Sequence, residues 1–216
     1  MSNLIFYILE IIGIVAFAIS GAMVAVSKKM DMFGVVMLGI ITAVGGGVMR
    51  DLILGITPPA IFIDPILVGV AAISSLLVFP KCIRNLMLKN EKAYDIFMLA
   101  FDSIGLGLFT VVGANIAITS GFGSKPFLVV CVSAITGTGG GVLRDVLAGE
   151  RPYIFVKHFY ALPAIIGAVA TVTVWHFFGK TSAIISGTAI IILLRILAAT
   201  FRWSLPKAKE IEKPQD

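Results

Sequence analysis

Charge is scarce in this sequence, because only 13% of its 216 residues are Asp, Glu, Lys or Arg, whereas 58% are hydrophobic. The mean hydropathy of +1.03 excludes an ordinary soluble domain, whose composition is far more polar. Long apolar runs separated by short polar segments indicate a membrane protein that crosses the bilayer several times. The length leaves room for about seven spans of ~20 residues and none for a separate soluble domain.

Cysteine and histidine are almost absent. The two cysteines, Cys82 and Cys131, are too few and too far apart for a disulfide framework or a zinc site. The two histidines, His158 and His176, add no pattern of metal ligands. Since no nucleophile and base are paired in the sequence either, we expect no enzyme activity, no metal site and no bound cofactor.

Basic residues outnumber acidic residues by 17 to 12, and the isoelectric point is near 9.3. Such an excess is compatible with nucleic-acid binding. Here, however, most of the positive charges lie in the gaps between apolar runs, where they orient a membrane protein and contact lipid headgroups. We therefore expect membrane lipids as partners, and no nucleic acid.

The apolar runs predict an all-α fold of seven transmembrane helices. Polar and helix-breaking residues separate the runs, as at Pro58 and Pro59 and at Gly179. The predicted helices span residues 4–26, 33–54, 64–79, 94–119, 127–147, 160–178 and 182–201.

The distribution of Lys and Arg predicts the orientation. If the N-terminus lies outside, the inside loops and the tail hold twelve Lys and Arg residues, and the outside loops hold only Lys125 and Lys180. This asymmetry follows the positive-inside rule. It predicts an external N-terminus and a cytoplasmic C-terminal tail over residues 203–216.

One seven-residue motif occurs twice, as Gly-Gly-Gly-Val-Met-Arg-Asp at residues 45–51 and as Gly-Gly-Gly-Val-Leu-Arg-Asp at residues 139–145. The similarity extends well beyond this motif, with spacings that grow only slightly along the chain. The further matched pairs are Glu10 with Asp102, Phe17 with Phe109, Thr42 with Thr136, Pro58 with Pro152 and Pro65 with Pro163.

The duplicated units cover about residues 4–80 and 94–178, and each contains three predicted helices. Because three is an odd number, the second unit enters the membrane from the opposite face, which makes an inverted repeat. The helix over residues 182–201 has no counterpart. Broken helices at matched positions of two inverted halves indicate a transport path, so we expect a single transmembrane domain, residues 1–202, with such a path between its halves.

The glycine triads are the candidate weak points of the second and fifth helices. Three glycines in a row allow a helix to kink or unwind, and the freed carbonyls can then replace part of a cation's hydration shell. The alternative is close helix packing, which small residues also permit. The predicted ion path consists of Gly45, Gly46, Gly47, Gly139, Gly140 and Gly141, with the hydroxyls of Thr42, Thr136 and Thr138.

Ionisable residues at membrane depth are costly and usually face a path or a partner. We expect Arg50 with Asp51, and Arg144 with Asp145, at the two mouths of the path; the alternative is that the arginines extend to the membrane surface. Glu10 and Asp102 are expected to pair with the arginine of their own unit. Arg195 is expected to extend to the surface.

The doubled motif in two three-helix units, followed by a seventh helix, resembles the prokaryotic branch of the TRIC family, whose members also carry a glycine-transporter label. The resemblance covers about residues 4–202. It implies a homotrimer in a bacterial or archaeal inner membrane, with one pore for K⁺ or Na⁺ in each protomer. It also implies that the glycine-kinked second and fifth helices line this pore.

The Lys-Glu-Val lipid-binding motif of animal members has no match here, so phosphoinositide binding is not transferred. No obligate protein partner is inferred. Inverted repeats with broken helices are also typical of carriers, so a secondary carrier for a small solute such as glycine is the alternative to a channel.

Overall fold

The computed structural model describes residues 2–80, 90–156, 160–201 and 203, and all regular structure within these ranges is helical. The predicted all-α class is therefore confirmed. The elements are α1 (Ser2–Ser27), α2 (Met32–Leu54), α3 (Ala60–Ile63), α4 (Pro65–Leu76), α6 (Glu91–Ala117), the π-helical turn η1 (Ile118–Phe122), α7 (Pro126–Leu147), α8 (Tyr153–Val156) and α9 (Ala161–Thr200).

Five of the described helices, α1, α2, α6, α7 and α9, are long and apolar enough to cross a membrane. The helix α4 is apolar but has only 12 residues. It lies where the third span was predicted, and the separate short helix α3 precedes it. The predicted boundaries of α1, α2, α6 and α7 agree with the structure to within a few residues.

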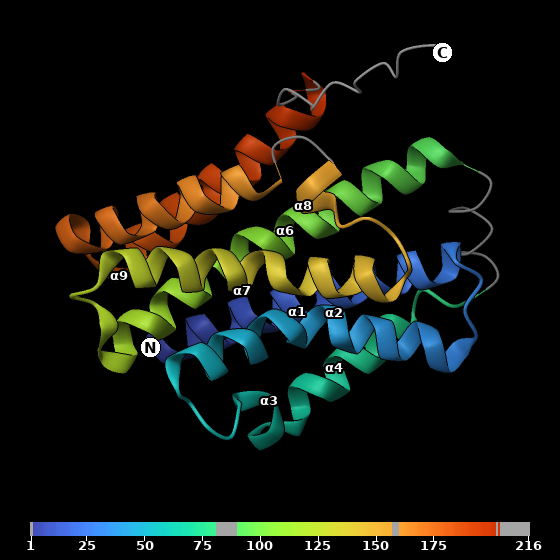
Figure 1. The fold of residues 1–216 in the computed structure, drawn as a ribbon, viewed down its shortest axis with the longest axis horizontal. Helices are drawn as coiled ribbons and strands as arrows, with labels where there is room; N and C mark the ends of the chain where they lie inside the picture. Colours follow the sequence, from blue (N-terminus) through green and yellow to red (C-terminus); the bar gives the residue numbers. More distant parts are fainter. Residues whose placement is uncertain (1, 81–89, 157–159, 202, 204–216) are drawn as a thin grey trace, which may run out of the picture.

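The helix α9 covers both of the last two predicted spans, and Gly179 divides it. This residue leaves the helical region with φ 79° and ψ 179°, so α9 folds back on itself as two antiparallel arms (Figure 1). The arms touch closely, because a Cβ atom on Gly187 of the second arm would overlap the Thr171 hydroxyl of the first.

Local sequence sets most helix ends. Asp31 and Asn90 cap α2 and α6, since their side chains accept hydrogen bonds from the amides of Gly34 (2.7 Å) and Ala93 (3.1 Å). Pro65 and Pro126 begin α4 and α7, where the missing amide proton costs nothing. The last residue of α2 is followed by Gly55 in the left-handed conformation, with φ 71°.

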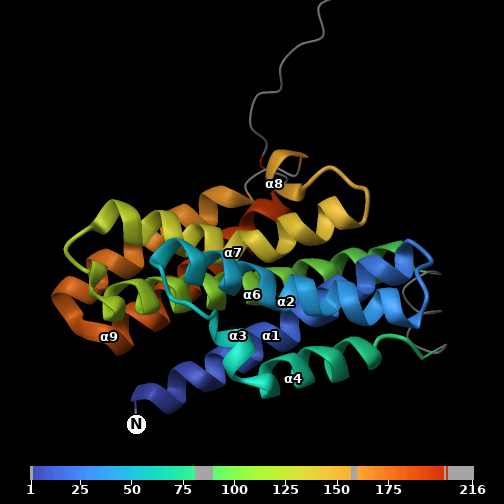
Figure 2. The ribbon, with the colours of Figure 1, turned by 60° about the horizontal axis from the view of Figure 1, so that its bottom comes forward.

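The helices α1, α2, α6 and α7 form the centre of the bundle. The helix α4 packs on α1 and α2 on one side, and α9 packs on α6 and α7 on the other (Figures 1 and 2). At the end where the chain begins, Lys180 Nζ lies 4.0 Å from the centre of the Phe6 ring. At the opposite end Lys28 pairs with Glu150 at 2.6 Å. We call these the first and the second end of the bundle.

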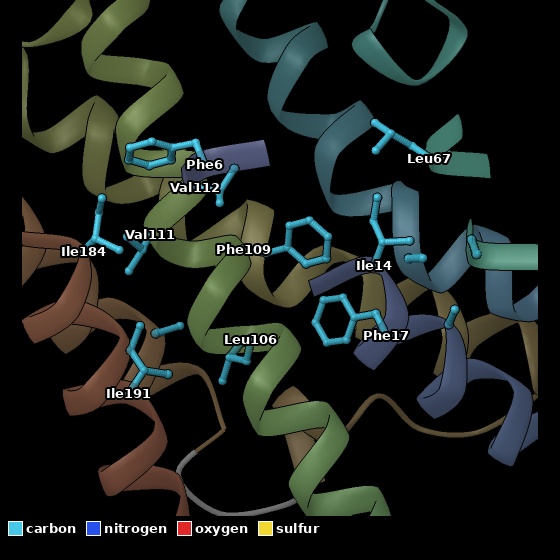
Figure 3. Packing of buried hydrophobic residues seen from close by; sticks show 14 of the residues in the cluster. Phe6, Ile14, Phe17, Leu67, Leu106, Phe109, Val111, Val112, Ile184 and Ile191 are labelled. Carbon is cyan, nitrogen blue, oxygen red and sulfur yellow. The ribbon is translucent and has the colours of Figure 1, made fainter. Parts of the chain in front are cut away.

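Aromatic and aliphatic side chains fill the space between the central helices. Phe17 and Phe109 face each other there, with Ile14 and Leu106 beside them (Figure 3). Many other large apolar side chains point outward, including Phe127, which is 82% exposed. Such a surface is expected where a protein meets lipid or another apolar partner. Residues 81–89 and nearly all of the predicted tail over 203–216 lie outside the described residues.

Candidate functional site

Both glycine triads lie within continuous α-helix. All six glycines have helical backbone in α2 and α7, and neither helix contains a residue outside the helical region. The unwinding expected at the triads is therefore not observed. Instead, the two triads pack directly against each other, and each helix keeps its own backbone hydrogen bonds.

The contact between the triads is reciprocal. A Cβ atom on Gly46 would overlap the carbonyl oxygen of Thr136, and a Cβ atom on Gly140 would overlap the carbonyl oxygen of Thr42. Gly46 and Gly140 are matched residues of the two units, and so are Thr42 and Thr136. The glycines thus allow backbone-to-backbone contact between α2 and α7, as the packing interpretation expects.

The candidate threonines are buried and satisfied within their own helices. The hydroxyls of Thr42 and Thr136 donate to the carbonyls of Leu38 and Val132, each at 2.6 Å. Thr138 donates to Ala134 at 2.7 Å. Since this bonding uses the hydroxyl proton, the oxygen retains its lone pairs and remains able to accept a hydrogen bond or a cation.

Each motif ends in what we call an Arg–Asp clasp. In the first clasp, Arg50 Nε donates to Asp51 Oδ1 at 2.8 Å, and Asp51 Oδ2 accepts from the amide of Ala60 at 2.9 Å. Arg50 is 2% exposed. The second clasp repeats this geometry, with Arg144, Asp145 and the amide of Tyr153 at 2.8 Å for both hydrogen bonds.

The two clasps lie toward opposite ends of the bundle, at the last turns of α2 and α7. Both arginines are buried, so neither extends to the surface. The alternative interpretation of these two residues was therefore wrong. Each carboxylate ties its helix to the short helix that follows, which fixes the chain beyond Gly55 and Gly149.

Around Asp102 the second clasp extends into a larger buried network. Asp102 Oδ1 accepts from Arg144 Nη1 at 2.8 Å and from the Tyr160 hydroxyl at 3.2 Å, and Oδ2 accepts from Arg195 Nη2 at 3.1 Å. Arg144 Nη1 also donates to Ser20. The predicted pairing of Asp102 with Arg144 is confirmed. In this network the positive charges of Arg144 and Arg195 are neutralised by Asp102 and Asp145, which lowers the free-energy cost of burying the four side chains.

Arg195 was expected to extend to the surface, and this prediction was wrong. Its side chain is 8% exposed, its Nε donates to Ser103 at 3.3 Å, and its guanidinium stacks 4.6 Å from the Tyr160 ring centre. An arginine within an apolar helix is itself a signal of a buried partner. This signal indicates that Arg195 has a buried partner, but it does not identify Asp102 as that partner.

Glu10 does not form the expected pair with Arg50. Within the described part of the chain no ion pair joins them, and Arg50 Nη1 has no hydrogen-bond partner. A pocket of about 20 Å³, enough for one water molecule, lies at this place. Its walls are Glu10, Ile14, Ala43, Val44, Gly47, Val48, Arg50, Asp51, Ala60, Ile61, Leu67 and Phe109.

The groups that the site presents are oxygen atoms and fixed charges. No group of three or more His, Cys, Asp or Glu able to hold a metal ion occurs among the described residues. Buried carboxylates stand near both ends. Between them the carbonyl oxygens of Thr42 and Thr136 lie at the crossing of α2 and α7, whereas the two threonine hydroxyls lie against Gly21 of α1 and Gly113 of α6. Such groups are suited to an ion that exchanges its hydration shell for protein oxygens.

A family profile described as "Glycine transporter" matches the chain twice, over residues 7–80 and 99–176. The UPF0126 inner membrane protein YadS of Escherichia coli K12 is 37% identical over 200 residues, which cover 92% of this chain and 93% of YadS.

Two solved structures are similar over nearly the whole chain. A TRIC cation channel matches with a TM-score of 0.80 and 41% identity, covering 96% of this chain and 98% of that one. The TRIC trimeric intracellular cation channel orthologue from Rhodobacter sphaeroides matches with a TM-score of 0.83 and 33% identity, covering 92% and 99%.

Proposed function

This chain belongs to the glycine-transporter family of membrane proteins, in its prokaryotic TRIC branch, and from that premise we propose that it is a monovalent cation channel. The observation that carries the proposal is its full-length similarity to solved TRIC cation channels. K⁺ and Na⁺ are the proposed permeating ions, because the site provides uncharged oxygens and balanced charge rather than a multivalent cage.

We infer an inverted repeat of two three-helix units, followed by a seventh crossing. The double match of the family profile supports two units. The reciprocal contacts of Gly46 and Gly140 support a two-fold axis through the crossing of α2 and α7. Counting α4 as one crossing and the two arms of α9 as two gives seven crossings in total.

The ion path is proposed to run between the two clasps, past the triads and the threonines at the centre. Glycine leaves the carbonyls of α2 and α7 uncovered by side chains, so they can take the place of water around a cation. In the structure the helices are uninterrupted here. We therefore assign bending at the triads to the conducting state, in which the tight crossing of α2 and α7 loosens.

The proposed assembly is a homotrimer in the inner membrane, with one path in each protomer, an external N-terminus and a cytoplasmic C-terminus. The name of the Rhodobacter relative as a trimeric channel supports the trimer, and the name of YadS supports the inner membrane. The positive-inside distribution of Lys and Arg supports the orientation. The first end of the bundle would then be external.

Recording from the purified full-length chain in a planar bilayer tests the function. With unequal KCl on the two sides, a cation channel gives discrete current steps that reverse near the K⁺ equilibrium potential. Saturable uptake of glycine into proteoliposomes, without any conductance, would instead identify a carrier. Reversal at the Cl⁻ potential would contradict the proposed selectivity.

A further inference from the structure

The two units treat the same arginine nitrogen differently. In the second unit, Arg144 Nη1 donates to Asp102 at 2.8 Å and also to Ser20. In the first unit, Arg50 Nη1 is buried and has no hydrogen-bond partner among the described residues. The remaining geometry of the two clasps is nearly identical, since Nε binds the neighbouring aspartate at 2.8 Å in both. Among the described residues Arg144 Nη2 is also buried without a partner, so each arginine leaves one nitrogen unpaired. The difference at Nη1 is the contact with Asp102 and Ser20, which only Arg144 makes.

The sequence explains the difference. Position 112, the counterpart of Ser20, is a valine and supplies no acceptor. The counterpart of Asp102 is Glu10, which is longer by one methylene group. The seventh crossing supplies Arg195 to Asp102 only, because that helix has no repeat partner. Asp102 is thus held from several sides, whereas no hydrogen bond or ion pair fixes Glu10 within the part of the chain that the structure describes.

Glu10 and Arg50 share the walls of one pocket. That pocket has room for about one water molecule. A buried guanidinium N–H without an acceptor is costly, so a water molecule or a carboxylate is expected to bind there. The only carboxylates among the pocket's described walls are Asp51, which already accepts from Arg50 Nε and the Ala60 amide, and Glu10.

We propose that Glu10 and Arg50 form a one-sided latch, which the structure shows released. In the latched state Glu10 accepts from Arg50 Nη1, fills the pocket and joins α1 to α2, as Asp102 joins α6 to α7. In the released state water occupies the pocket and Glu10 presents a free carboxylate to a cation at the first end. The matching contact in the second unit, between Asp102 and Arg144, stays formed in both states. Gating by this kind of contact therefore occurs only at the first end of the bundle.

The latch rests on the proposed channel function and predicts how the current is gated. In the latched state Glu10 fills the pocket and its charge is paired with Arg50, so neither space nor a free carboxylate remains for a cation at the first end. The latched state is therefore the closed state of the channel. Glu10→Gln exchanges a charged acceptor for a neutral one and lowers the ratio of closed to open time by roughly tenfold. Val112→Ser gives Arg50 the acceptor that Ser20 gives Arg144. In the second unit serine and Asp102 bind the same nitrogen together, so this variant favours the latched arrangement and raises the ratio of closed to open time.

The two variants separate a latch from a simple mouth charge. Val112→Ser keeps the carboxylate, so its single-channel conductance equals that of the wild type, whereas Glu10→Gln also lowers the conductance. The control is Glu150→Gln, which removes one negative charge at the partly exposed pair with Lys28 and leaves the ratio unchanged. A closed-to-open ratio within about twofold of wild type in both latch variants overturns the proposal.

Thiol labelling tests the same asymmetry without any current. In a background without Cys82 and Cys131, a cationic methanethiosulfonate reagent is added to the purified protein in detergent, where both ends of the bundle are accessible. Glu10→Cys reacts at least about tenfold faster than Ser103→Cys, because position 103 is buried behind Arg195. Equal rates overturn the latch. If the bilayer recordings show no current but the two cysteines are labelled at different rates, the channel function is overturned. The open pocket beside Glu10 is then still supported.

Discussion

Phe17 and Phe109, which occupy the same position in the two repeat units, stack on each other with ring centres 5.3 Å apart and planes 26° apart. Each ring also lies against a glycine of the other unit, Phe17 against Gly105 and Phe109 against Gly13. Figure 3 shows the two rings facing each other between α1 and α6. The stack therefore joins the two units through equivalent residues.

We expect Phe17→Leu and Phe109→Leu to lower the free energy of unfolding by similar amounts, about 1–3 kcal/mol each, through lost volume and lost ring stacking. Thermal unfolding in detergent measures this loss. Phe97→Leu is the control, since Phe97 also stacks on an aromatic ring but is 41% exposed, and its effect should be smaller. A large effect of only one core variant would contradict the equivalence of the two positions.

Gly46→Ala and Gly140→Ala should both be strongly destabilising, by about 1–3 kcal/mol or more, because the added methyl group meets backbone atoms that have little freedom to move. Gly69→Ala in α4 is the control. A Cβ atom there meets nothing within 4 Å, and helix propensity favours alanine by up to ~1 kcal/mol. If all three variants unfolded at the melting temperature of the wild type, the crossing of α2 and α7 would be looser than the structure shows.

Asp102→Asn should cost about 3–5 kcal/mol, because it leaves Arg144 and Arg195 buried without their shared carboxylate. The comparison is Glu150→Gln at a partly exposed ion pair, for which at most ~1 kcal/mol is expected. Unfolding by denaturant in detergent gives both values. Equal effects of the two variants would show that the Asp102 network contributes no more than a surface pair.

Thr42→Val and Thr136→Val should reduce the single-channel K⁺ conductance by roughly twofold or more, since each removes an oxygen beside the proposed path. Thr173→Val is a matched control. Its hydroxyl also bonds back to its own helix, at 2.9 Å to Val169, but it lies on the exposed surface of α9. An equal reduction by all three variants would place Thr42 and Thr136 away from the path.

Much of the fold was predictable because its signals are local or repeated in the sequence. Apolar runs gave the positions of α1, α2, α6 and α7, and capping residues such as Asp31 and Asn90 mark where helices begin. The doubled motif identified the residues of both clasps, whereas the hydrogen bond between Arg50 and Asp51 was not predicted, because adjacent residues of a helix do not normally face each other. The pairing of Asp102 with Arg144 followed from the repeat.

Other features depended on packing between distant segments. The triads were compatible with either a break or a close contact, and the reciprocal overlap of Gly46 with Thr136 favours contact. Arg195 was assigned to the surface because its position along a helix does not reveal which neighbour its side chain meets. Its partner Asp102 lies 93 residues away.

The sequence by itself determined that the chain is a helical membrane protein made of two related units with charge buried in matched places. Apolar length and internal duplication carry that information without any knowledge of contacts. Only the tertiary structure decided that Asp102 is held by two arginines, while Glu10 forms no ion pair within the described residues. The partners of a buried charge are set by which helices pack together, and among the described residues the unrepeated last helix places its Arg195 beside Asp102.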